Sequence, residues 1–507
     1  MSDNKRIAKN TLYLYFRMIL IMAVTLFMSR VILDKLGIND YGLYNVVGGI
    51  VGMLGFLNGT LSIGTSRFIT YELGVCSFDK LKKTFSTAFY VHLILGVIII
   101  ILMETIGVWY LYNKMIIPLE RFEACFWVFQ LSILMTFISI TQIPYTATIM
   151  AHERMGIYAF ISIFEAFGKL GICYLLSWGN IDKLILYSLL LAFVQFFVAI
   201  CYRVYCITKF PESKICLSFD KSILKNLLSF SGWNIMANMS NTLGIQGVLL
   251  LINLFFTSTV AAAQSVAGQV SNAMMLFVNN FRMAINPQII KLYAVKDYEG
   301  SKKLTLDSTV YCFDLILMLG LPAIIIMDKL MHIWLVEVPD YAIAFTQWII
   351  IRQIISTFSA SFYTPMIAAN KMKINSIASV ILGFGEFAII YAFLKIGFGP
   401  MWIQYLGVIS AIGFSMIVKP YVLIKQINYS LKEIGICYWI CLKVLLLSGV
   451  ISLALCYFLD DSLMQTLLKA VISGLSVVIA SYAFLGKSTR IKLNSFIKSK
   501  IDNVKKR

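Results

Sequence analysis

The stretch that decides the fold is Lys9–Arg67, KNTLYLYFRMILIMAVTLFMSRVILDKLGINDYGLYNVVGGIVGMLGFLNGTLSIGTSR. It contains two apolar runs, 11–33 and 41–65, which are joined by the short loop 34–40. Each run is long enough to cross a bilayer as a helix, which needs about 20 apolar residues. Arg17 lies inside the first run, where an arginine costs roughly 2.5–3.5 kcal/mol on insertion scales and therefore faces protein or water. The stretch predicts a transmembrane hairpin that holds a cation.

The same hydropathy continues along the whole chain. Of its 507 residues, 59% are hydrophobic and 13% are charged, whereas soluble proteins average about 25% charged residues. The outer loop 327–341 is too short for a folded external domain, and no cleavable signal is expected. The pattern predicts an all-α polytopic membrane protein with about 14 spans, at 11–33, 41–65, 84–108, 124–149, 157–178, 184–206, 227–254, 261–281, 306–326, 342–366, 374–394, 402–424, 437–458 and 464–485.

Loop charge predicts the orientation. The net charge is +18, and its basic residues cluster in alternate segments, which argues against nucleic acid as a partner. If the N-terminus is cytoplasmic, these segments are all inner ones, so both termini are expected in the cytoplasm. The basic tail after Gly486 is either an amphipathic helix on the inner leaflet or a solvated segment. The inner basic residues include Arg67, Arg154, Arg203, Lys209, Arg282, Lys371, Lys419 and Lys425.

The opening hairpin is repeated about 220 residues later. Lys9–Leu12 resembles Lys225–Leu228, and Arg67 matches Arg282 at the inner end of the second helix of each copy. An offset of six spans predicts two parallel six-helix bundles around a central cleft, as in transporters that work by alternating access. The predicted organisation is an N-terminal bundle at 1–210, a C-terminal bundle at 211–430, two additional helices at 431–486 and a basic cytoplasmic tail at 487–507.

Polar side chains inside the spans are candidates for the cleft. Gly48, Gly52, Gly55 and Gly59 share one face of the second span, which indicates close helix packing or room for a bulky ligand. Amides in the second, seventh and eighth spans either bond between helices or line a wet cavity that binds substrate. The amides predicted to bind substrate are Asn45, Asn234, Asn238, Asn241, Gln264 and Asn272.

Charges inside the spans complete the predicted site. Arg17 and Arg352 have no acidic residue one helical turn away, so they are expected to attract an anion, above all phosphate. Arg30 and Lys169 are further candidates, although Glu165 lies four residues before Lys169 and offers it a structural ion pair. Arg67 and Arg282 are predicted to close the inner end. We expect no catalytic residue and no metal site, because the ten cysteines form no CxxC pair and the three histidines are scattered.

Short motifs in the chain resemble a known family. The stretches Lys9-Asn10-Thr11, Arg30-Val31-Ile32-Leu33 and Leu36-Gly37-Ile38-Asn39-Asp40-Tyr41-Gly42-Leu43-Tyr44-Asn45 resemble the first hairpin of the Wzx-like O-antigen and polysaccharide flippases. Ala151-His152-Glu153-Arg154 looks like the short inner loop of that family. These flippases form the polysaccharide exporter branch of the multidrug/oligosaccharidyl-lipid/polysaccharide exporter superfamily.

The resemblance implies a function in lipopolysaccharide O-antigen synthesis. Such proteins move undecaprenyl-pyrophosphate-linked oligosaccharide from the inner to the outer leaflet of the bacterial cytoplasmic (inner) membrane. It implies membrane lipids, a polysaccharide polymerase and a chain-length regulator as partners, and no cofactor. Coupling to a gradient of H⁺ or Na⁺ would use Glu165, Asp314 or Glu386, the acidic residues near the middle of spans.

Three other functions stay open. A lipid II flippase of the same superfamily also has fourteen spans and a cationic cavity. A multidrug exporter carries organic cations, which Arg17 and Arg352 oppose. A membrane glycosyltransferase or polymerase needs a large outer loop with acids, and the only outer acidic pair, Asp460-Asp461, lies in a short loop. No nucleotide or metalloprotease motif is present, so an enzyme is not expected.

Overall fold

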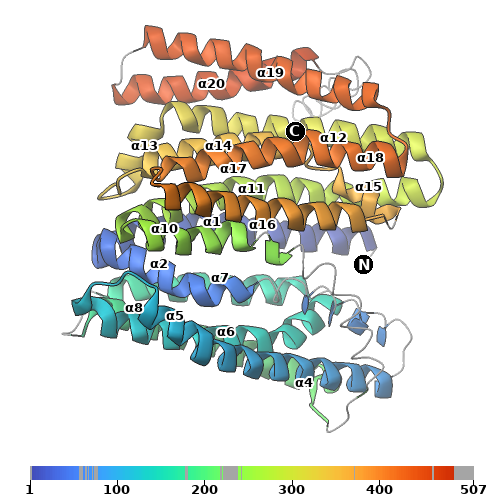
Figure 1. The fold of residues 1–507 in the computed structure, drawn as a ribbon. Coiled ribbons are helices and arrows are strands. Elements are labelled where there is room, and N and C mark those ends of the chain that lie inside the picture. Colours follow the sequence, from blue (N-terminus) through green and yellow to red (C-terminus); the bar gives the residue numbers. More distant parts are fainter. Residues whose placement is uncertain are drawn as a thin grey trace, which may run out of the picture. The chain divides into compact units, whose positions relative to one another are not determined.

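The computed structural model describes residues 3–55, 61–62, 65–66, 68–70, 72–73, 78–152, 154–176, 181–216, 220, 238–240, 242–369, 371–459 and 462–484. Within these ranges the chain is helical and contains no strand (Figure 1). Its helical segments are α1 (Asp3–Leu36), α2 (Ile38–Gly52), η1 (Met53–Gly55), α4 (Phe78–Leu102), η2 (Met103–Gly107), α5 (Val108–Asn113), η3 (Leu119–Arg121), α6 (Phe122–Ala151), α7 (Met155–Leu175), α8 (Lys183–Lys209), η4 (Pro211–Ser213), η5 (Leu243–Gly247), α10 (Val248–Phe255), α11 (Ser258–Ala294), α12 (Tyr298–Ile325), α13 (Met327–Trp334), α14 (Ala342–Thr357), α15 (Tyr363–Ala368), α16 (Lys373–Ile396), α17 (Met401–Ile412), η6 (Gly413–Val418), α18 (Lys419–Ile427), α19 (Leu431–Phe458) and α20 (Leu463–Phe484).

Ten helices of the described ranges are long and apolar enough to cross a membrane, and each matches a predicted span. They confirm the predicted all-α polytopic membrane protein. The other four predicted spans contain α2, α10, α11 and α14. Helices α2, α10 and α14 are short, and α11 is rich in amides. The ten spanning helices are 16–36, 78–113, 119–151, 155–175, 183–209, 298–325, 373–396, 401–427, 431–458 and 464–484.

Contacts divide the chain into two compact units. Unit 1 comprises 1–269, 332–345 and 373–407, and unit 2 comprises 270–331, 346–372 and 408–507. Unit 1 therefore adds three later segments to the predicted N-terminal bundle 1–210. The division into six-helix bundles at 1–210 and 211–430 stays a prediction.

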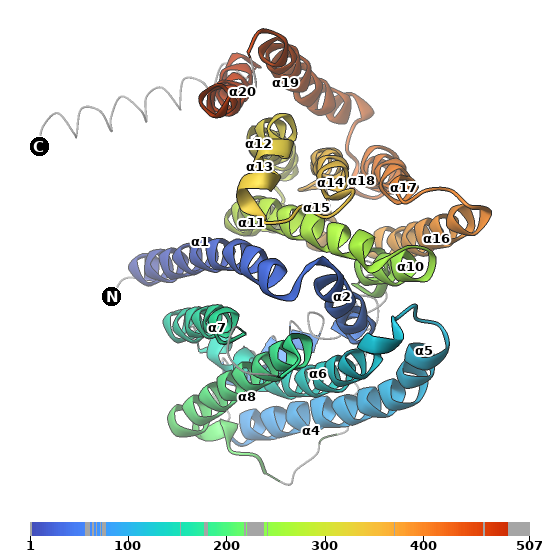
Figure 2. The same ribbon diagram turned by 90° about the vertical axis from the view of Figure 1, so that its left-hand side faces the viewer.

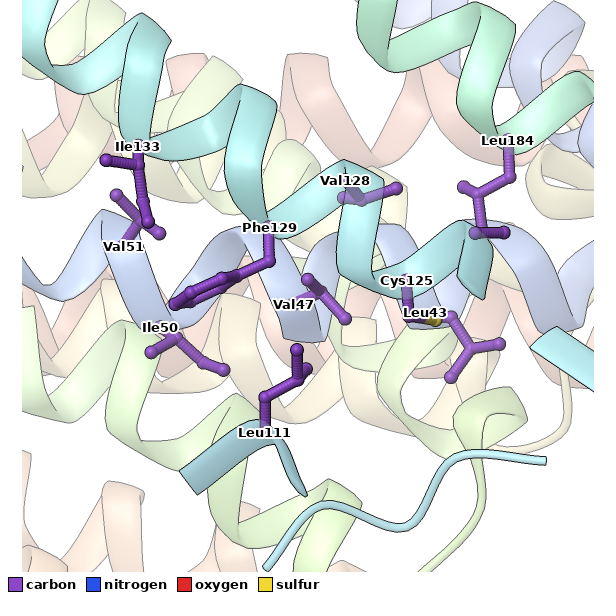
Figure 3. Packing of buried hydrophobic residues seen from close by; sticks show 11 residues of the cluster. Leu43, Val47, Ile50, Val51, Leu111, Cys125, Val128, Phe129, Ile133 and Leu184 are labelled. Carbon is purple, nitrogen blue, oxygen red and sulfur yellow. The ribbon is translucent and has the colours of Figure 1, made fainter. Parts of the chain in front are cut away.

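Helix α6 is central to unit 1. It packs against α2, α4 and α8, and it is apolar on all sides, as expected of a helix that other helices surround. Helix α7 packs between α1 and α8 (Figure 2). Val47 and Ile50 of α2 pack with Val128 and Phe129 of α6 in one buried hydrophobic cluster (Figure 3). This core fixes α2, which belongs to the opening hairpin, against the rest of the unit.

One arginine joins three loops at one end of unit 1. Arg121, in η3, binds Asp40 through two nitrogens and Asp182 through two more hydrogen bonds. Asp182 also caps α8, because its Oδ1 accepts hydrogen bonds from the backbone nitrogens of Leu184 (2.9 Å) and Ile185 (3.3 Å). The cluster holds the starts of α2, α6 and α8 together.

Unit 2 is built on α12. Helix α12 packs against α15 and against the two C-terminal helices α19 and α20, which also pack on each other. A buried cluster that includes Phe362, Met366, Val422 and Leu423 joins α15 to α18. Helix α19 begins with a capping box. The backbone nitrogen of Ser430 donates to Glu433 Oε2 at 2.8 Å, and that of Lys432 donates to Ser430 Oγ at 3.2 Å.

Candidate functional site

Arg17 faces a polar stripe on α7. Its guanidinium carbon lies 4.6 Å from the ring centroid of Tyr158, and Nη1 donates to Ser162 Oγ at 3.4 Å. Its Nε is buried and has no hydrogen-bond partner within the described ranges. Tyr158, Ser162, Glu165 and Lys169 recur at helical spacing, so they share the face of α7 that α1 covers. The insertion cost of Arg17 is therefore met inside unit 1 by an aromatic ring and a hydroxyl.

The stripe continues with the predicted ion pair. Lys169 Nζ lies 2.6 Å from Glu165 Oε1, and both side chains are partly exposed. This structural pairing of Lys169 was one of the two alternatives from the sequence. Within the described residues no carboxylate forms an ion pair with Arg17, since Glu165 is bonded to Lys169. Arg17 is consequently a cation beside this stripe whose charge no carboxylate of the stripe neutralises.

A second cationic position lies in unit 2. Arg282 of α11 and Lys419 of α18 are close enough for their charges to interact. Lys419 Nζ donates to Ser359 O at 3.5 Å and lies 4.9 Å from the ring centroid of Phe414. The Nε of Arg282 is buried without a hydrogen-bond partner among the residues described. In that part of the chain neither cation has a carboxylate beside it, so the pair would be stabilised by an anion.

Two π-helical segments lie at polar side chains described in this section. Segment η6 ends at Val418, directly before Lys419, and segment η5 contains Gln246. A π-helical turn inserts an extra residue and rotates the side chains that follow, and such turns are frequent at functional sites. Segment η6 therefore changes the direction in which the side chain of Lys419, the next residue, leaves the helix.

Two glutamines of unit 1, Gln264 and Gln269, bond to side chains of other helices. Gln404 Nε2 donates to Gln264 Oε1 at 2.6 Å, and Gln269 bonds to both Tyr41 and Ser29. Asn45 donates to the carbonyl of Tyr41 at 2.7 Å, within its own helix. Interhelical bonding, the first of the two alternatives for these amides, therefore accounts for Gln264, whereas Asn45 bonds within its own helix. In unit 2, Asn272 is exposed on α11.

The glycine face of α2 is a packing surface. A Cβ at Gly52 would lie 3.3 Å from Nε2 of Gln246, and a Cβ at Gly49 would lie 3.2 Å from its Oε1. A Cβ at Gly48 would be 3.8 Å from Ser132 Oγ. Close approach of η5 and α6 therefore accounts for these glycines. Gly59 lies outside the described residues.

Comparison with known proteins defines the fold. No family model and no curated protein matches the sequence. Among solved structures, the lipid II flippase MurJ in an inward closed conformation has a TM-score of 0.69 and 13% identity, over 94% of this chain and 98% of that chain. An inward-facing multidrug resistance MATE family transporter of the MOP superfamily has a TM-score of 0.65 and 12% identity, over 79% and 98%. A MOP superfamily transporter from Pyrococcus furiosus, whose structure is titled for the reverse polarity of its binding pocket, has a TM-score of 0.61 and 13% identity, over 82% and 95%.

The chain has the fold of these three transporters, and two of them are titled as members of the MOP superfamily. This fold agrees with the superfamily named from the sequence motifs, and the Wzx-like branch stays a prediction.

The remaining predicted cations and amides lie in several different parts of the fold. Arg30 Nη1 donates to the carbonyl of Ile333 at 3.0 Å, and Trp334 Nε1 donates to the carbonyl of Leu26 at 2.6 Å, so this part of α1 is tied to the end of α13 within unit 1. Arg352 is half-buried in α14 of unit 2. Arg67, Asn234 and Asn241 lie outside the described residues, and Asn238 is half-buried just before η5.

The predicted coupling acids lie in different surroundings of the fold. Glu165 is in the ion pair of α7, and Glu386 is half-buried in α16 of unit 1. Asp314 of α12 lies near Cys441 of α19 and Ser481 of α20, and its Oδ1 has no hydrogen-bond partner in the described ranges. Asp314 therefore faces the two additional C-terminal helices. The coupling role of the three acids stays a prediction.

Sequence reasoning missed two partners of the cations. Tyr158 is not among the predicted site residues, although its spacing from Glu165 and Lys169 places it on the same helix face. Lys419 was counted with the inner basic residues. The proximity of Lys419 to Arg282 could not be predicted from sequence, because the two residues are far apart in the chain.

Proposed function

We propose that this chain is a flippase that moves undecaprenyl-pyrophosphate-linked oligosaccharide from the inner to the outer leaflet of the bacterial cytoplasmic membrane by alternating access. The observation that carries the proposal is the set of cations without a carboxylate partner in the described residues. The members on which the proposal rests are Arg17 in unit 1, and Arg282 with Lys419 in unit 2. A pyrophosphate offers the charge and the hydrogen-bond acceptors that such cations lack.

The chemistry of the ligand follows from these side chains. A guanidinium binds phosphate oxygens through a planar fork of N–H donors, and it does so most strongly away from bulk water. The ring of Tyr158 packs against the Arg17 guanidinium, and this contact reduces the conformational freedom that Arg17 loses on binding. The exposed amide of Asn272 suits sugar hydroxyls, and the prenyl chain would remain in lipid.

The same cations argue against the other classes. A multidrug exporter of organic cations would meet repulsion at Arg17 and at Arg282 with Lys419. A glycosyltransferase or polymerase needs acids in a large outer loop, and the sequence offers only short ones. We therefore propose a transporter without enzymatic activity.

A lipid II-type flippase is the second candidate. The similarity to MurJ extends over 94% of this chain, against 79% for the inward-facing MATE transporter, and MurJ is itself a flippase. Both candidates share a polyprenyl pyrophosphate, so the cations favour them equally. The two candidates differ in the sugar that the lipid carries, so a measurement of which substrate is transported will distinguish them.

The test is transport in proteoliposomes that contain the purified chain. Flipping is followed with a fluorescent undecaprenyl-pyrophosphate oligosaccharide and, separately, with fluorescent lipid II. We expect the Arg17→Ala and Arg282→Gln variants to lose at least tenfold in rate, and Arg17→Lys to retain more activity than Arg17→Ala. Lys425→Gln removes an inner charge elsewhere and is the matched control. Normal rates in folded Arg17→Ala and Arg282→Gln would contradict the proposal.

We propose a polysaccharide polymerase and a chain-length regulator as partners of this chain. We also propose that transport is coupled to an H⁺ or Na⁺ gradient. Glu386→Gln and Asp314→Asn are the informative variants. An imposed H⁺ or Na⁺ gradient should accelerate transport by the unmodified chain. The variant that replaces the coupling acid should abolish this acceleration, while exchange of substrate without a gradient should continue. If neither variant changes the response, these acids are not the coupling site.

A further inference from the structure

A groove on unit 1 lies apart from the cations described above. It has a volume of about 460 Å³ and is lined by α4, α6 and α8. Helix α6 packs against both α4 and α8 and forms the floor, and the three helices run alongside one another (Figures 1 and 2). The lining is apolar except for Thr141 and Arg203. Its other residues are Phe89, Leu93, Leu131, Leu134, Phe137, Ile138, Leu189, Ala192, Phe193, Phe196, Ala199 and Ile200.

The wall on α8 is open to the surroundings of the protein. Leu189, Phe193 and Phe196 are 51%, 65% and 51% exposed. In a spanning helix such side chains face lipid. From Leu189 to Arg203 the groove follows α8 for about 21 Å, which is enough for one acyl chain through a leaflet.

Arg203 closes the groove at one end. Its Nη2 donates to Thr141 Oγ1 at 2.8 Å, and its guanidinium carbon lies 5.8 Å from the ring centroid of Tyr145. Its Nε is buried and has no hydrogen-bond partner in the part of the chain described. Thr141 thus holds the guanidinium sideways against α6, within the groove, instead of letting it extend to the end of α8.

The depth of Arg203 matches a lipid headgroup. Helix α8 has 27 residues and is therefore about 40 Å long, which exceeds the hydrocarbon core of about 30 Å. Arg203 lies six residues before the end of α8 at Lys209, about 9 Å along the axis, and so close to the boundary between acyl chains and headgroups. Loop charges assign this end to the cytoplasmic side, where anionic lipids attract basic residues.

We propose that the groove binds a resident anionic phospholipid, with an acyl chain along α4, α6 and α8 and its phosphate on Arg203. A guanidinium with a free N–H beside an apolar channel is complementary to that lipid. The lining offers no polar side chain beyond Thr141 and Arg203, so it has no place for the sugars of a lipid-linked oligosaccharide. This site is independent of the proposed transport function.

The test uses photoactivatable lipids with a diazirine in the acyl chain. The full-length chain is reconstituted with either phosphatidylglycerol or phosphatidylcholine probes, and labelled peptides are identified by mass spectrometry. In the unmodified chain we expect phosphatidylglycerol to label groove peptides of α4, α6 and α8 at least fivefold more than phosphatidylcholine. Equal labelling by the two lipids would overturn the proposal without any variant.

Variants locate the headgroup. Arg203→Gln should reduce the ratio of phosphatidylglycerol labelling to phosphatidylcholine labelling, here called the preference, to near one. Arg203→Lys should retain most of this preference. Lys209→Gln removes the same charge from the exposed end of α8 and should leave the preference within twofold. If Lys209→Gln lowers it as much as Arg203→Gln, general surface charge is responsible and the proposal is wrong. Stronger groove labelling by a photoactivatable undecaprenyl phosphate would instead identify the groove as a site for the substrate tail, which also overturns it.

Discussion

Arg121 binds the carboxylate of Asp40 with two nitrogens, Nε to Oδ1 at 2.9 Å and Nη2 to Oδ2. Asp40 belongs to the loop motif by which the sequence resembles polysaccharide flippases. The same guanidinium reaches Asp182 Oδ2 through Nη1 at 2.5 Å. The motif therefore has a structural reason in this chain: its aspartate anchors the opening hairpin to the starts of α6 and α8.

Replacing Arg121 by glutamine should destabilise unit 1. The variant loses the bidentate pair and leaves Asp40 and Asp182 facing each other. Because hydrogen bonds to charged groups contribute about 1.5–3 kcal/mol, we expect a loss of roughly that size in the free energy of unfolding in detergent. Asp34→Asn is the control, since the Lys35–Asp34 pair is exposed and 3.4 Å apart; its effect should stay below about 1 kcal/mol. Equal effects of both changes would contradict the structural role of Arg121.

The acid sensitivity of this cluster should depend on Asp182. Burial opposes its ionisation, but the hydrogen bonds from Arg121 and from the backbone of Ile185 and Leu184 outweigh burial and lower the pKa of that carboxyl. An unfolded aspartate titrates near pH 4. Ionised Asp182 therefore contributes stability above about pH 4, and this contribution is lost as the pH falls below that value.

Asp182→Asn isolates this charge, because asparagine still caps α8. The unfolding temperature of the variant should fall less between pH 7 and pH 3.5 than that of the unmodified chain. Asp182→Ala removes both charge and cap, and should cost about 1 kcal/mol more than Asp182→Asn at pH 7. A variant with the same pH dependence as the unmodified chain would show that Asp182 does not titrate in this range.

Two helical glycines should respond oppositely to alanine. A Cβ at Gly42 would overlap the backbone carbonyl of Ser258, whereas a Cβ at Gly171 has no heavy atom within 4 Å. Gly42→Ala forces α2 away from the start of α11 and should destabilise the protein by about 1–3 kcal/mol. Gly171→Ala should stabilise it by about 0.5–1 kcal/mol through helix propensity. Chemical unfolding in detergent measures both, and a neutral Gly42→Ala would refute this close approach.

Pyrophosphate should stabilise the purified chain through Lys419. Binding to Arg282 and Lys419 relieves the repulsion between the two cations and shifts the unfolding equilibrium. We expect millimolar pyrophosphate to raise the unfolding temperature by about 2 °C, and sulfate at equal ionic strength to raise it less. Lys419→Gln should remove this stabilisation while itself raising the unfolding temperature without ligand. Lys425→Gln should behave as the unmodified chain does.

The site was predictable to the extent that its residues share a helix. The pair of Glu165 and Lys169 follows from a spacing of four residues, and the structure confirms it. The ring of Tyr158 over Arg17 depends on how α1 is rotated against α7, which no local pattern specifies. Gln264 shows the same limit, because its amide could serve a cavity or another helix, and only the position of Gln404 decides between them.

The sequence by itself determined the membrane character, the spans, the predicted orientation and the need to shield Arg17. Transfer of side chains from water to lipid depends on local composition, so hydropathy and loop charge are readable along the chain. Only the tertiary structure decided which cations lie together and which groove faces lipid. Arg282 lies near Lys419, and Arg203 donates to Thr141. Helix rotation and packing fix these directions, and both arise from contacts between residues far apart in the chain.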